Sequence, residues 1–547
     1  MNLIETALKQ AIQNAVKKAF DTSIDLEEIV VEEPKSKEHG DYASNVAMRL
    51  AKALKQNPRN VAQTILQEID TKEGGIRQAE IAGPGFINFF MEAGSLSEVI
   101  KKVLTEDTKY GNTESSDKRK WNVEYVSANP TGDLHPGHAR GASIGDSLTR
   151  IMKAAGYDVT REYYINDAGN QINNMAKSLQ ARYLQHYGVE AVVPEDGYHG
   201  KDLIEIAQTV ANEVGDIYVN ADKEESLAIF RSFGLREETK KLREDLLAFN
   251  VEFDVWTSEQ SIYDRGLVEK ALTKLIEQGH TYVHEEATWL KTTDFGDDKD
   301  RVLVRGNGLY TYLMPDIAYH LNKKDRGYDV LIDLLGADHH GYIARLKAAI
   351  QALGYPAGDL DVDIIQMARM IKDGEEFKMS KRTGKAVSLK DLTEAAGVDA
   401  VRYYFVSRAG DTHMDLDLDM ASKQSNENPV YYAQYAHARM CSIQRNANMD
   451  VADTFERIAH PKEIELCKIM IDFPQMIKDA ALTRQPHKVC NYIQKLAAAF
   501  HAFYNECQVL NLEDGALSAQ RLGLVKATQY TLRNALTLIG VSAPEKM

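Results

Sequence analysis

Two histidines separated by a proline and a glycine stand where a predicted strand gives way to a predicted helix. The run is His135-Pro136-Gly137-His138, and it follows the apolar stretch over 122–127. A helix N-terminus presents unpaired N–H groups and a positive dipole end to an anion, and two imidazoles there can donate to phosphate oxygens. The glycine has no Cβ, so a flat base or a ribose can lie close to the backbone. A surface histidine pair and a fortuitous metal pair are the alternatives.

A second candidate is a basic loop about 240 residues further along the chain, Lys378-Met379-Ser380-Lys381. It follows an apolar run that ends near Met370, at the carboxyl end of a predicted strand, where ligands bind in open α/β sheets. Lysines there can neutralise the charge that builds up on a phosphoryl group during transfer. A solvated basic loop is the alternative. Each motif alone is weak, but the two in this order, with a long segment between them, form a specific combination.

The elements that must position these motifs alternate between short apolar runs and helical patterns, from Trp121 to about Lys390. Such alternation is typical of a parallel sheet with crossover helices. The apolar runs are Asn122–Ser127, Asp158–Ile165, Val330–Leu335 and Val362–Met370. An acidic, mostly helical segment at about 190–300 interrupts the alternation, and we expect it to be an insertion between two halves of one sheet.

The sequence predicts four regions in total. They are an N-terminal domain at 1–115, the α/β domain at 116–390, a connecting stem at 391–429 and a helical domain at 430–547. Within the last region, apolar and aromatic residues from Val489 to Cys507 step by three and four, as on the inward face of a helix. We interpret this stripe as core rather than as a platform for stacking bases.

The net charge of −16 argues at first against a nucleic-acid partner, because phosphate binding needs local positive charge. The charge is unevenly distributed, however. Residues 190–300 carry 12 basic and 26 acidic side chains, a net charge of −14, whereas residues 430–547 carry 13 basic and 11 acidic ones, a net charge of +2. The average therefore excludes no partner. We expect the acidic face of the inserted segment to point away from any bound RNA, or to keep unproductive RNA off the protein.

Several other classes of protein are disfavoured. No stretch approaches the roughly 18 consecutive apolar residues of a transmembrane helix. Apolar residues recur every four positions over 4–20 among charged ones, which indicates a folded amphipathic helix and not a signal peptide. The four cysteines, Cys441, Cys467, Cys490 and Cys507, include no C-x-x-C pair, which argues against a structural metal or a redox site. We expect a reduced, cytoplasmic protein.

Both motifs resemble the two signature motifs of class I aminoacyl-tRNA synthetases. The segments over 124–134, 399–404, 39–43 and 82–88 resemble the arginyl-tRNA synthetases more narrowly, and the resemblance extends over essentially the whole chain. It implies a Rossmann-like parallel-sheet catalytic domain with a helical insertion. It also implies an N-terminal α+β domain that contacts the tRNA elbow and a C-terminal all-helical anticodon-binding domain. The second position of the first motif is Pro136, where the class usually has isoleucine.

The resemblance implies roles for individual residues as well. The catalytic residues would be His135, His138, Lys378 and Lys381. ATP would be bound by His135, Gly137, His138, Asp338, His339, Lys378, Met379, Ser380 and Lys381. Arginine would be bound by Glu124, Asn129, His138, Tyr312 and Asp316. Mg²⁺ is expected to accompany ATP, and no structural metal is expected.

Elementary chemistry agrees with an arginine site but leaves alternatives open. A planar guanidinium offers five donors in a fixed fork and is satisfied by carboxylates and carbonyl oxygens. Asp316 follows Pro315 at a predicted helix start, where a carboxylate is favoured with or without a ligand. Glu124 lies in an apolar strand, where an unpaired carboxylate is costly, and this favours a functional role.

Two further strand ends carry polar residues. The segment 336–341 ends one predicted strand and opens a helix, so we expect it on the nucleotide side. Which of Asp338, His339 or His340 makes contact stays open. Asp167 also follows a predicted strand, and a ligand contact and a structural cap are equally consistent with its position.

The activity that the resemblance implies is ATP-dependent activation of L-arginine to arginyl-adenylate, followed by transfer to the 2′-OH of the terminal adenosine of tRNA(Arg). The expected partners are tRNA(Arg), L-arginine and ATP, with no membrane, no obligate protein partner and a monomeric state. Two rivals are weighed. A small-molecule nucleotidylyltransferase can share the first motif but would not explain the second motif or the C-terminal helices. A catalytically silent tRNA-binding paralogue would lose motif residues that are intact here.

Overall fold

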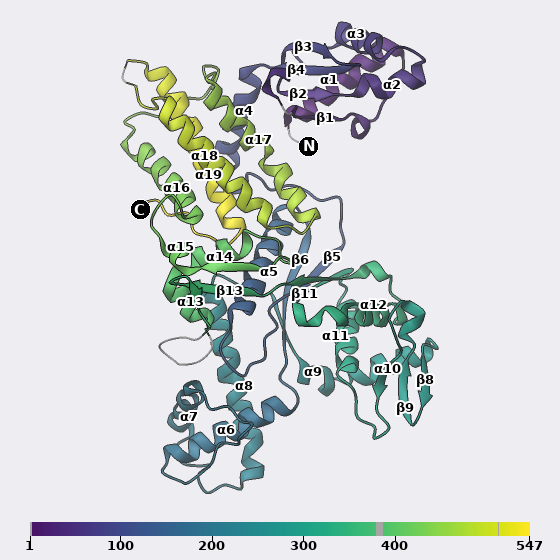
Figure 1. Ribbon diagram of the computed structural model, residues 1–547, viewed down its shortest axis with the longest axis vertical. Helices are drawn as coiled ribbons and strands as arrows, with labels where there is room; N and C mark the ends of the chain where they lie inside the picture. Colours follow the sequence, from purple (N-terminus) through teal and green to yellow (C-terminus); the bar gives the residue numbers. More distant parts are fainter. Residues whose placement is uncertain (1–2, 35, 379–386, 512) are drawn as a thin grey trace.

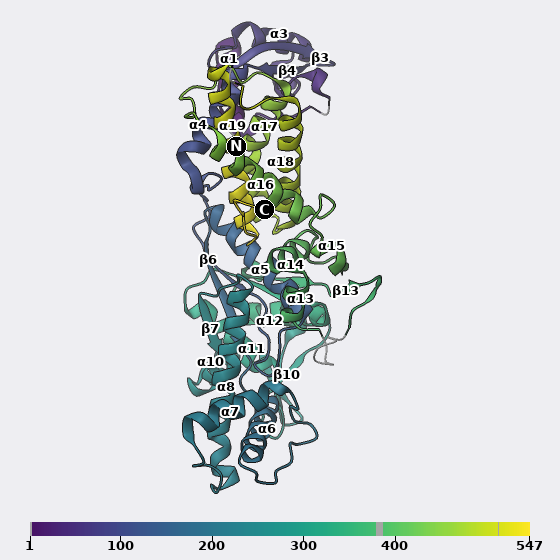
Figure 2. The same ribbon diagram turned by 90° about the vertical axis from the view of Figure 1, so that its left-hand side faces the viewer.

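The computed structural model describes residues 3–34, 36–378, 387–511 and 513–547. The molecule is elongated, with a small N-terminal domain at one end and a helical subdomain at the other (Figure 1, Figure 2). A parallel sheet and a bundle of long helices lie between these two ends. Within the described ranges, no helix is both long and apolar enough to cross a membrane.

The N-terminal domain combines helices with a four-stranded antiparallel sheet of order β1-β2-β4-β3. Its elements are α1 (Leu3–Phe20), β1 (Val31–Glu32), β2 (Tyr42–Ser44), α2 (Val46–Leu54), α3 (Pro58–Glu68), β3 (Ile76–Ala82) and β4 (Phe86–Met91), and α4 (Ala93–Glu106) leads away from it. The four-residue apolar repeat buries Leu8, Ile12 and Val16 along one face of α1. The α+β expectation for this region is therefore confirmed.

The central sheet has five parallel strands in the order β12-β11-β5-β6-β7. The strands and their connecting elements are β5 (Lys120–Glu124), α5 (Pro136–Ala154), β6 (Asp158–Ile165), β7 (Val255–Ser258), β11 (Val330–Gly336), η5 (Ala337–Tyr342), α12 (Ile343–Ala352) and β12 (Leu360–Ile365). The chain winds from β5 toward β6 on one side and later returns through β11 on the other, so the order reverses between β5 and β11. Ligands bind outside the carboxyl ends of the strands at such a point. The Rossmann-like sheet is confirmed.

Two insertions interrupt the central sheet along the chain, one before β7 and one after it. The first holds α6 (Asn170–His186), α7 (Lys201–Val214) and α8 (Lys223–Ala248). The second holds α9 (Glu259–Asp264), α10 (Leu267–Glu277), β8 (Thr281–His284), β9 (Ala287–Leu290), β10 (Arg301–Val304) and α11 (Leu313–Asp325). The sequence predicts one insertion at about 190–300, but β7 lies inside that range and pairs with β6. The four residues of β7 are two apolar ones followed by two polar ones, so they form no apolar run long enough to reveal a strand.

The C-terminal part begins with a small sheet and ends in four long helices. Its elements are β13 (Ala368–Lys372), β14 (Glu375–Glu376), α13 (Leu389–Ala396), α14 (Val398–Val406), β15 (Met414–Asp417), α15 (Leu418–Ser422), α16 (Pro429–Asn446), α17 (Pro461–Leu482), α18 (His487–Glu506) and α19 (Gly515–Leu538). The helical prediction is confirmed, and Val489, Ile493, Leu496 and Phe500 of α18 are buried as core. All four cysteines of the chain are buried in or beside these helices as free thiols.

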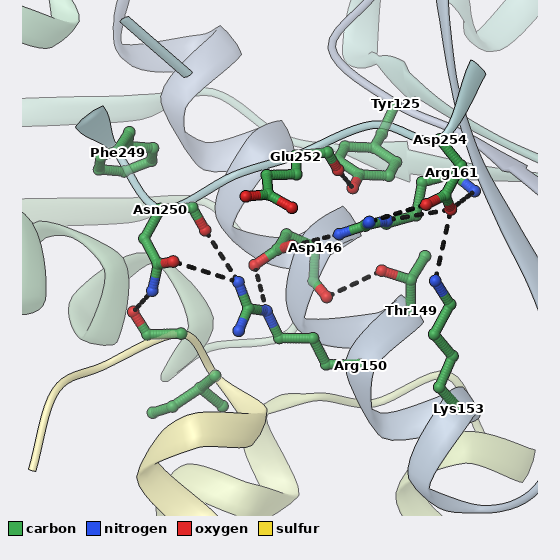
Figure 3. Close-up of polar contacts among 12 residues, drawn as sticks. Tyr125, Asp146, Thr149, Arg150, Lys153, Arg161, Phe249, Asn250, Glu252 and Asp254 are labelled. Carbon is green, nitrogen blue, oxygen red and sulfur yellow. Dashed lines mark hydrogen bonds and ion pairs between the residues drawn. The ribbon is translucent and has the colours of Figure 1, made fainter. Parts of the chain in front are cut away.

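A group of charged side chains, two of them fully buried, ties α5 to the C-terminal bundle, and Figure 3 shows Asp146 of this group with Arg150 and Arg161. Asp146 of α5 accepts hydrogen bonds from Arg150 Nε (2.7 Å) and from Arg402 Nη2 of α14 (2.5 Å), and Arg161 of β6 lies 3.9 Å away. Arg402 also donates to the carbonyl oxygen of Ile539, directly after α19. We call Asp146, Arg150, Arg161 and Arg402 the Asp146 hub. The hub fixes the helix that follows the first motif relative to the end of the bundle.

Candidate active site

The first motif forms the start of α5, with His135 as the N-cap. Nδ1 of His135 accepts from the N–H groups of Gly137 (3.1 Å) and His138 (3.4 Å), while Nδ1 of His138 accepts from the N–H of His135 (3.3 Å). An Nδ1 that accepts carries no proton, so both rings are neutral and hold their proton on Nε2. The rings stack with their centroids 3.6 Å apart. Two Nε2–H donors are therefore fixed together at a helix N-terminus.

The environment keeps His138 neutral. Burial, and then the neighbouring His135, lower the pKa of His138 to about 3. The pair therefore offers hydrogen bonds to an anion, and the positive potential comes from the helix terminus. A Cβ at Gly137 would lie 2.9 Å from Cε1 of His135, so the glycine is needed for this ring arrangement. Within the described part of the chain, no group of three or more His, Cys, Asp or Glu side chains could hold a metal ion.

The second motif is described only at its first residue. Lys378 is exposed and pairs with Glu376 of β14 (3.0 Å). Met379, Ser380 and Lys381 lie outside the described residues.

The other predicted nucleotide contacts, Asp338 and His339, belong to η5, directly after the carboxyl end of β11. Their side chains, and that of His340, also lie outside the described part of the structure. The backbone alone is consistent with the nucleotide side that the sequence predicts for this segment.

Glu124 is the last residue of β5, and its side chain is buried. Oε1 accepts from Ser127 Oγ (2.9 Å), and Oε2 accepts from Lys323 Nζ of α11 (2.6 Å). Burial raises the pKa of Glu124, and Lys323 acts in the opposite direction. The apolar strand thus does not hold an unpaired carboxylate, because a lysine 199 residues away in sequence faces it.

The turn after β5 has a strained backbone. Val126 and Ser127 have φ values of 70° and 39°, in a region that β-branched residues rarely adopt. The Ser127 hydroxyl holds the turn by donating to Glu124 and accepting from the N–H of Tyr164 (3.1 Å). Such strain persists where the surrounding structure enforces it, commonly at functional sites.

Asp316 lies in the first turn of α11, with 28% of its side chain exposed. Its Oδ1 is 3.1 Å from His320 Nδ1. The phenol of Tyr164 is within electrostatic reach of both Asp316 and Glu124, and these carboxylates, after burial and Glu259, raise its pKa far above the ordinary value. The structure therefore gathers two of the predicted arginine-binding carboxylates around one tyrosine.

The other three predicted arginine contacts are placed differently, and one of them, His138, belongs to the first turn of α5 described above. Tyr312 precedes α11 and is 90% exposed. Asn129 donates to Oε1 of Gln171 (2.7 Å), at the start of α6. Neither side chain makes a hydrogen bond to Glu124 or Asp316 in the described structure.

A third carboxylate near this site is absent from the sequence-based prediction. Glu259 opens α9, directly after the carboxyl end of β7, and burial followed by repulsion from Asp167 raises its pKa to about 7. Asp167 itself accepts from the N–H of Gln260 (2.8 Å) and from Ser258 Oγ (2.6 Å), which supports the capping interpretation for that residue. Recognising β7 as a strand would have drawn attention to Glu259, since the residue stands at the same edge of the sheet.

The carboxyl edge of the sheet therefore has two ends of different chemical character. At the start of α5, neutral imidazoles and backbone N–H groups provide donors suited to phosphate oxygens. Around Tyr164, carboxylates provide acceptors and negative charge suited to a planar cation.

Three protein-family models match the chain in succession. The "Arginyl tRNA synthetase N terminal domain" matches residues 6–91. The "tRNA synthetases class I (R), catalytic domain" matches residues 99–404, and the "DALR anticodon binding domain" matches residues 433–547.

Similar proteins agree with these matches over the full length. The arginine–tRNA ligase of Bacillus subtilis is 54% identical over 556 residues, covering 100% of both chains, and that of Geobacillus kaustophilus is 52% identical over 100% of this chain and 99% of the relative. The solved structure of Thermus thermophilus arginyl-tRNA synthetase has the same fold, with a TM-score of 0.73 and 24% identity over 100% of both chains. The resemblance seen in the motifs is confirmed. The chain belongs to the class I arginyl-tRNA synthetases and is an arginine–tRNA ligase.

Proposed function

We propose that ATP binds at the donor end of the sheet's carboxyl edge and L-arginine at the acidic end. The observation that carries this proposal is the pair of opposite environments next to β5: the neutral imidazoles of His135 and His138, and the carboxylates of Glu124 and Asp316. Phosphate oxygens only accept hydrogen bonds, whereas a guanidinium only donates them, so the two substrates need these two environments.

At the donor end, the imidazole Nε2–H groups of His135 and His138 donate to phosphate oxygens, and Gly137 leaves room for the nucleoside. The second motif, Lys378 to Lys381, supplies positive charge, and Asp338 and His339 line the nucleotide side. Mg²⁺ bound with ATP would neutralise part of the phosphate charge.

At the acidic end, Asp316 and Glu124 accept hydrogen bonds from the guanidinium, and charge-assisted hydrogen bonds of this kind are strong. Asn129, His138 and Tyr312 complete the arginine site. An uncharged side chain would offer no charged donors to the partly open carboxylate of Asp316, so the site discriminates strongly without a proofreading domain.

The reaction has two steps. The carboxylate of arginine attacks the α-phosphate of ATP, the bond to pyrophosphate breaks and arginyl-adenylate forms. The 2′-OH of the terminal adenosine of tRNA(Arg) then attacks the arginyl carbonyl, and AMP leaves. A carboxylate is already a nucleophile, so the protein's task in the first step is positioning and stabilisation of phosphate charge.

The terminal domains bind the tRNA, with residues 1–115 at its elbow and residues 430–547 at its anticodon; the catalytic domain spans 116–390 and the stem 391–429. Support for the anticodon surface comes from Tyr504, which belongs to the stripe predicted as core but is only half-buried, with the guanidinium of Arg439 4.1 Å from its ring centre. Both residues line a surface cavity of about 560 Å³. Aromatic rings and arginines together suit unstacked bases and their phosphates.

We further propose that the enzyme acts in the cytoplasm as a monomer without an obligate protein partner. Light scattering after size-exclusion chromatography, with and without tRNA, tests the oligomeric state. A dimer at micromolar concentration contradicts the monomer.

ATP–pyrophosphate exchange in the presence of cognate tRNA tests the proposed function. Exchange is expected with arginine alone among the amino acids. A nucleotidylyltransferase would not depend on arginine, and a silent paralogue would give no exchange. Absence of exchange from folded protein with cognate tRNA overturns the enzymatic proposal.

Substitutions then separate the two ends of the site. Lys381→Ala is expected to lower kcat for exchange with little change in the KM for arginine, whereas Asp316→Asn should act mainly on that KM. A loss confined to arginine affinity in Lys381→Ala contradicts the phosphate role of the second motif.

A further inference from the structure

One face of α11 carries three charged side chains that point toward the central sheet. Asp316, His320 and Lys323 are spaced by four and three residues, which puts them on the same side of the helix. Asp316 is partly open to solvent, whereas His320 and Lys323 are buried. Buried charged groups need partners, and these two find them in the strands beneath α11.

The partners form a continuous chain of contacts. Nδ1 of His320 lies 2.8 Å from the backbone carbonyl oxygen of Asp316 and 3.1 Å from its Oδ1, and Nε2 lies 2.7 Å from Asp333 Oδ2. Lys323 Nζ lies 3.0 Å from Asp333 Oδ1 and 2.6 Å from Glu124 Oε2. We call these five residues the arginine-end network. Its two end members, Asp316 and Glu124, are the carboxylates proposed above to bind the guanidinium.

The network holds its charges despite burial. Burial opposes the positive charge on His320 and Lys323, but Asp333 and the other carboxylates outweigh it: they raise the pKa of His320 to about 10 and that of Lys323 above its ordinary value. Burial likewise opposes the charge on Asp333, and Lys323 and His320 outweigh it, so that its pKa is lowered. With Glu124 ionised against Lys323, the network contains three carboxylates and two cations, a net charge of −1.

The charged groups around the network do not neutralise its excess negative charge. Glu162 of β6 is matched by Arg326, whose Nη2 lies 2.8 Å from each carboxylate oxygen. Glu259 of α9 adds negative charge rather than removing it, and Arg345 of α12 faces the ring of Tyr342 (5.2 Å). The most open member of the network is Asp316, so an incoming cation meets the excess charge there.

We propose that His320 and Lys323 are positioning residues for the substrate, and that the guanidinium of arginine is the third cation that neutralises the network. His320 orients Asp316, and Lys323 orients Glu124 and keeps it ionised. Neither residue touches the substrate. The proposal rests on the proposed arginine site and adds to it the residues that set its charge and geometry.

The first test compares two replacements of His320. The side-chain amide nitrogen of asparagine lies near the position of Nδ1, and that of glutamine near Nε2. His320→Asn therefore keeps a donor toward Asp316, whereas His320→Gln keeps one toward Asp333 and removes the imidazole donor toward Asp316. In exchange assays with tRNA, we expect the KM for arginine to rise about 30-fold in His320→Gln and about threefold in His320→Asn.

Two further readouts separate positioning from a general loss of structure. The KM for ATP and the kcat of both variants should stay within about threefold of wild type, because the ATP end does not depend on the network. Equal effects of the two replacements, or a parallel loss of ATP affinity and kcat, overturn the proposal. Lys324→Met is the matched control, since the neighbouring lysine of α11 pairs with Asp359 (2.7 Å) outside the network. It should leave the KM for arginine unchanged.

The second test addresses the net charge. Asp333→Asn makes the network neutral and should raise the KM for arginine about tenfold, although Asp333 lies behind the site. Asp333→Glu keeps the net charge at −1 and should bind arginine more tightly than Asp333→Asn. If Asp333→Glu binds arginine no better than Asp333→Asn, the charge argument fails.

Asp316→Asn distinguishes failure of this inference from failure of the proposed site. If Asp316→Asn leaves the KM for arginine unchanged, the arginine site itself is wrong. If Asp316→Asn raises that KM while the His320 variants do not, the site stands and the positioning role is wrong.

Discussion

Two networks of charged side chains in this protein differ in what compensates their excess charge. The arginine-end network consists of side-chain charges, with carboxylates in excess and one of them open to solvent. The Asp146 hub has arginines in excess, and its central pair, Asp146 and Arg402, is fully buried.

The hub satisfies its extra donors with the backbone. Arg402 donates to the carbonyl oxygens of Phe249 (3.0 Å), Asn250 (3.1 Å) and Ile539 (3.1 Å) in addition to Asp146. Arg161 has a second carboxylate in Asp254 (2.8 Å), also seen in Figure 3. Backbone carbonyl oxygens accept the hydrogen bonds of Arg402 that Asp146 does not accept, so the hub needs no ligand. Its role is to hold α5, α14 and the end of α19 together. The excess charge of the arginine-end network is negative, so its carboxylates need donors, and in our proposal the guanidinium of arginine supplies them.

The largest expected effect breaks the hub. Asp146→Asn leaves the guanidinium of Arg402 buried without a counter-charge, and we expect a loss of about 3–5 kcal/mol in the free energy of unfolding. Urea unfolding followed by circular dichroism measures it. The KM for arginine of the folded variant should be unchanged. A loss below about 1 kcal/mol would mean that the carbonyls alone hold Arg402.

The second effect acts on the other network. Asp316→Asn removes the open carboxylate, and we expect the KM for arginine to rise about 100-fold, close to 3 kcal/mol of binding free energy, with an unchanged melting temperature. Steady-state exchange kinetics and a thermal melt measure the two quantities. A fall in stability without a change in KM would make this network structural, like the hub.

The third effect tests how tightly the hub is packed. Gly540 has a φ of +66°, and a Cβ there would lie 2.2 Å from Nη2 of the immobile Arg402. Gly540→Ala should therefore cost about 2 kcal/mol of stability from the backbone conformation and the displaced guanidinium. Gly279→Ala is a matched control, with a φ of +76° and no atom within 4 Å of its Cβ. Equal losses in both variants would exclude a contribution from the contact with Arg402.

The smallest effect is a difference in pH dependence. His320 has a pKa raised to about 10 from an ordinary 6.5, so it contributes stability that is complete below pH 6.5 and is lost as the pH rises toward 10. We expect the unfolding free energy of wild type to fall over this window by on the order of 1–2 kcal/mol more than that of His320→Gln. Parallel profiles for the two proteins would contradict a protonated His320.

Much of the architecture is predictable because its signals are local. The first motif sits between a strand and a helix whose patterns are both readable, and the bundle shows its apolar stripe from Val489 onward. β7 is not predictable from the sequence because its four residues show neither a long apolar run nor a clear alternation of apolar and polar residues. Glu259 is missed with it.

The charged networks are harder to predict because their partners are distant in sequence. Glu124 meets Lys323 across 199 residues, and Asp146 meets Arg402 across 256. The sequence alone does not show which distant residue neutralises a given charge. Glu124 in an apolar strand therefore suggests a ligand contact, whereas in the fold its carboxylate is paired with Lys323. The spacing of Asp316, His320 and Lys323 on α11 is the one local sign of the arginine-end network.

The confinement of all four cysteines to the C-terminal helices has a practical consequence. Burial raises the pKa of Cys467 and Cys490, and residues 1–440 contain no cysteine. Alkylation requires an accessible thiolate, so a thiol reagent modifies this chain when the bundle opens. The rate of cysteine labelling therefore measures opening of the C-terminal bundle and of no other domain. It can be measured without introducing a cysteine and in the presence of the substrates.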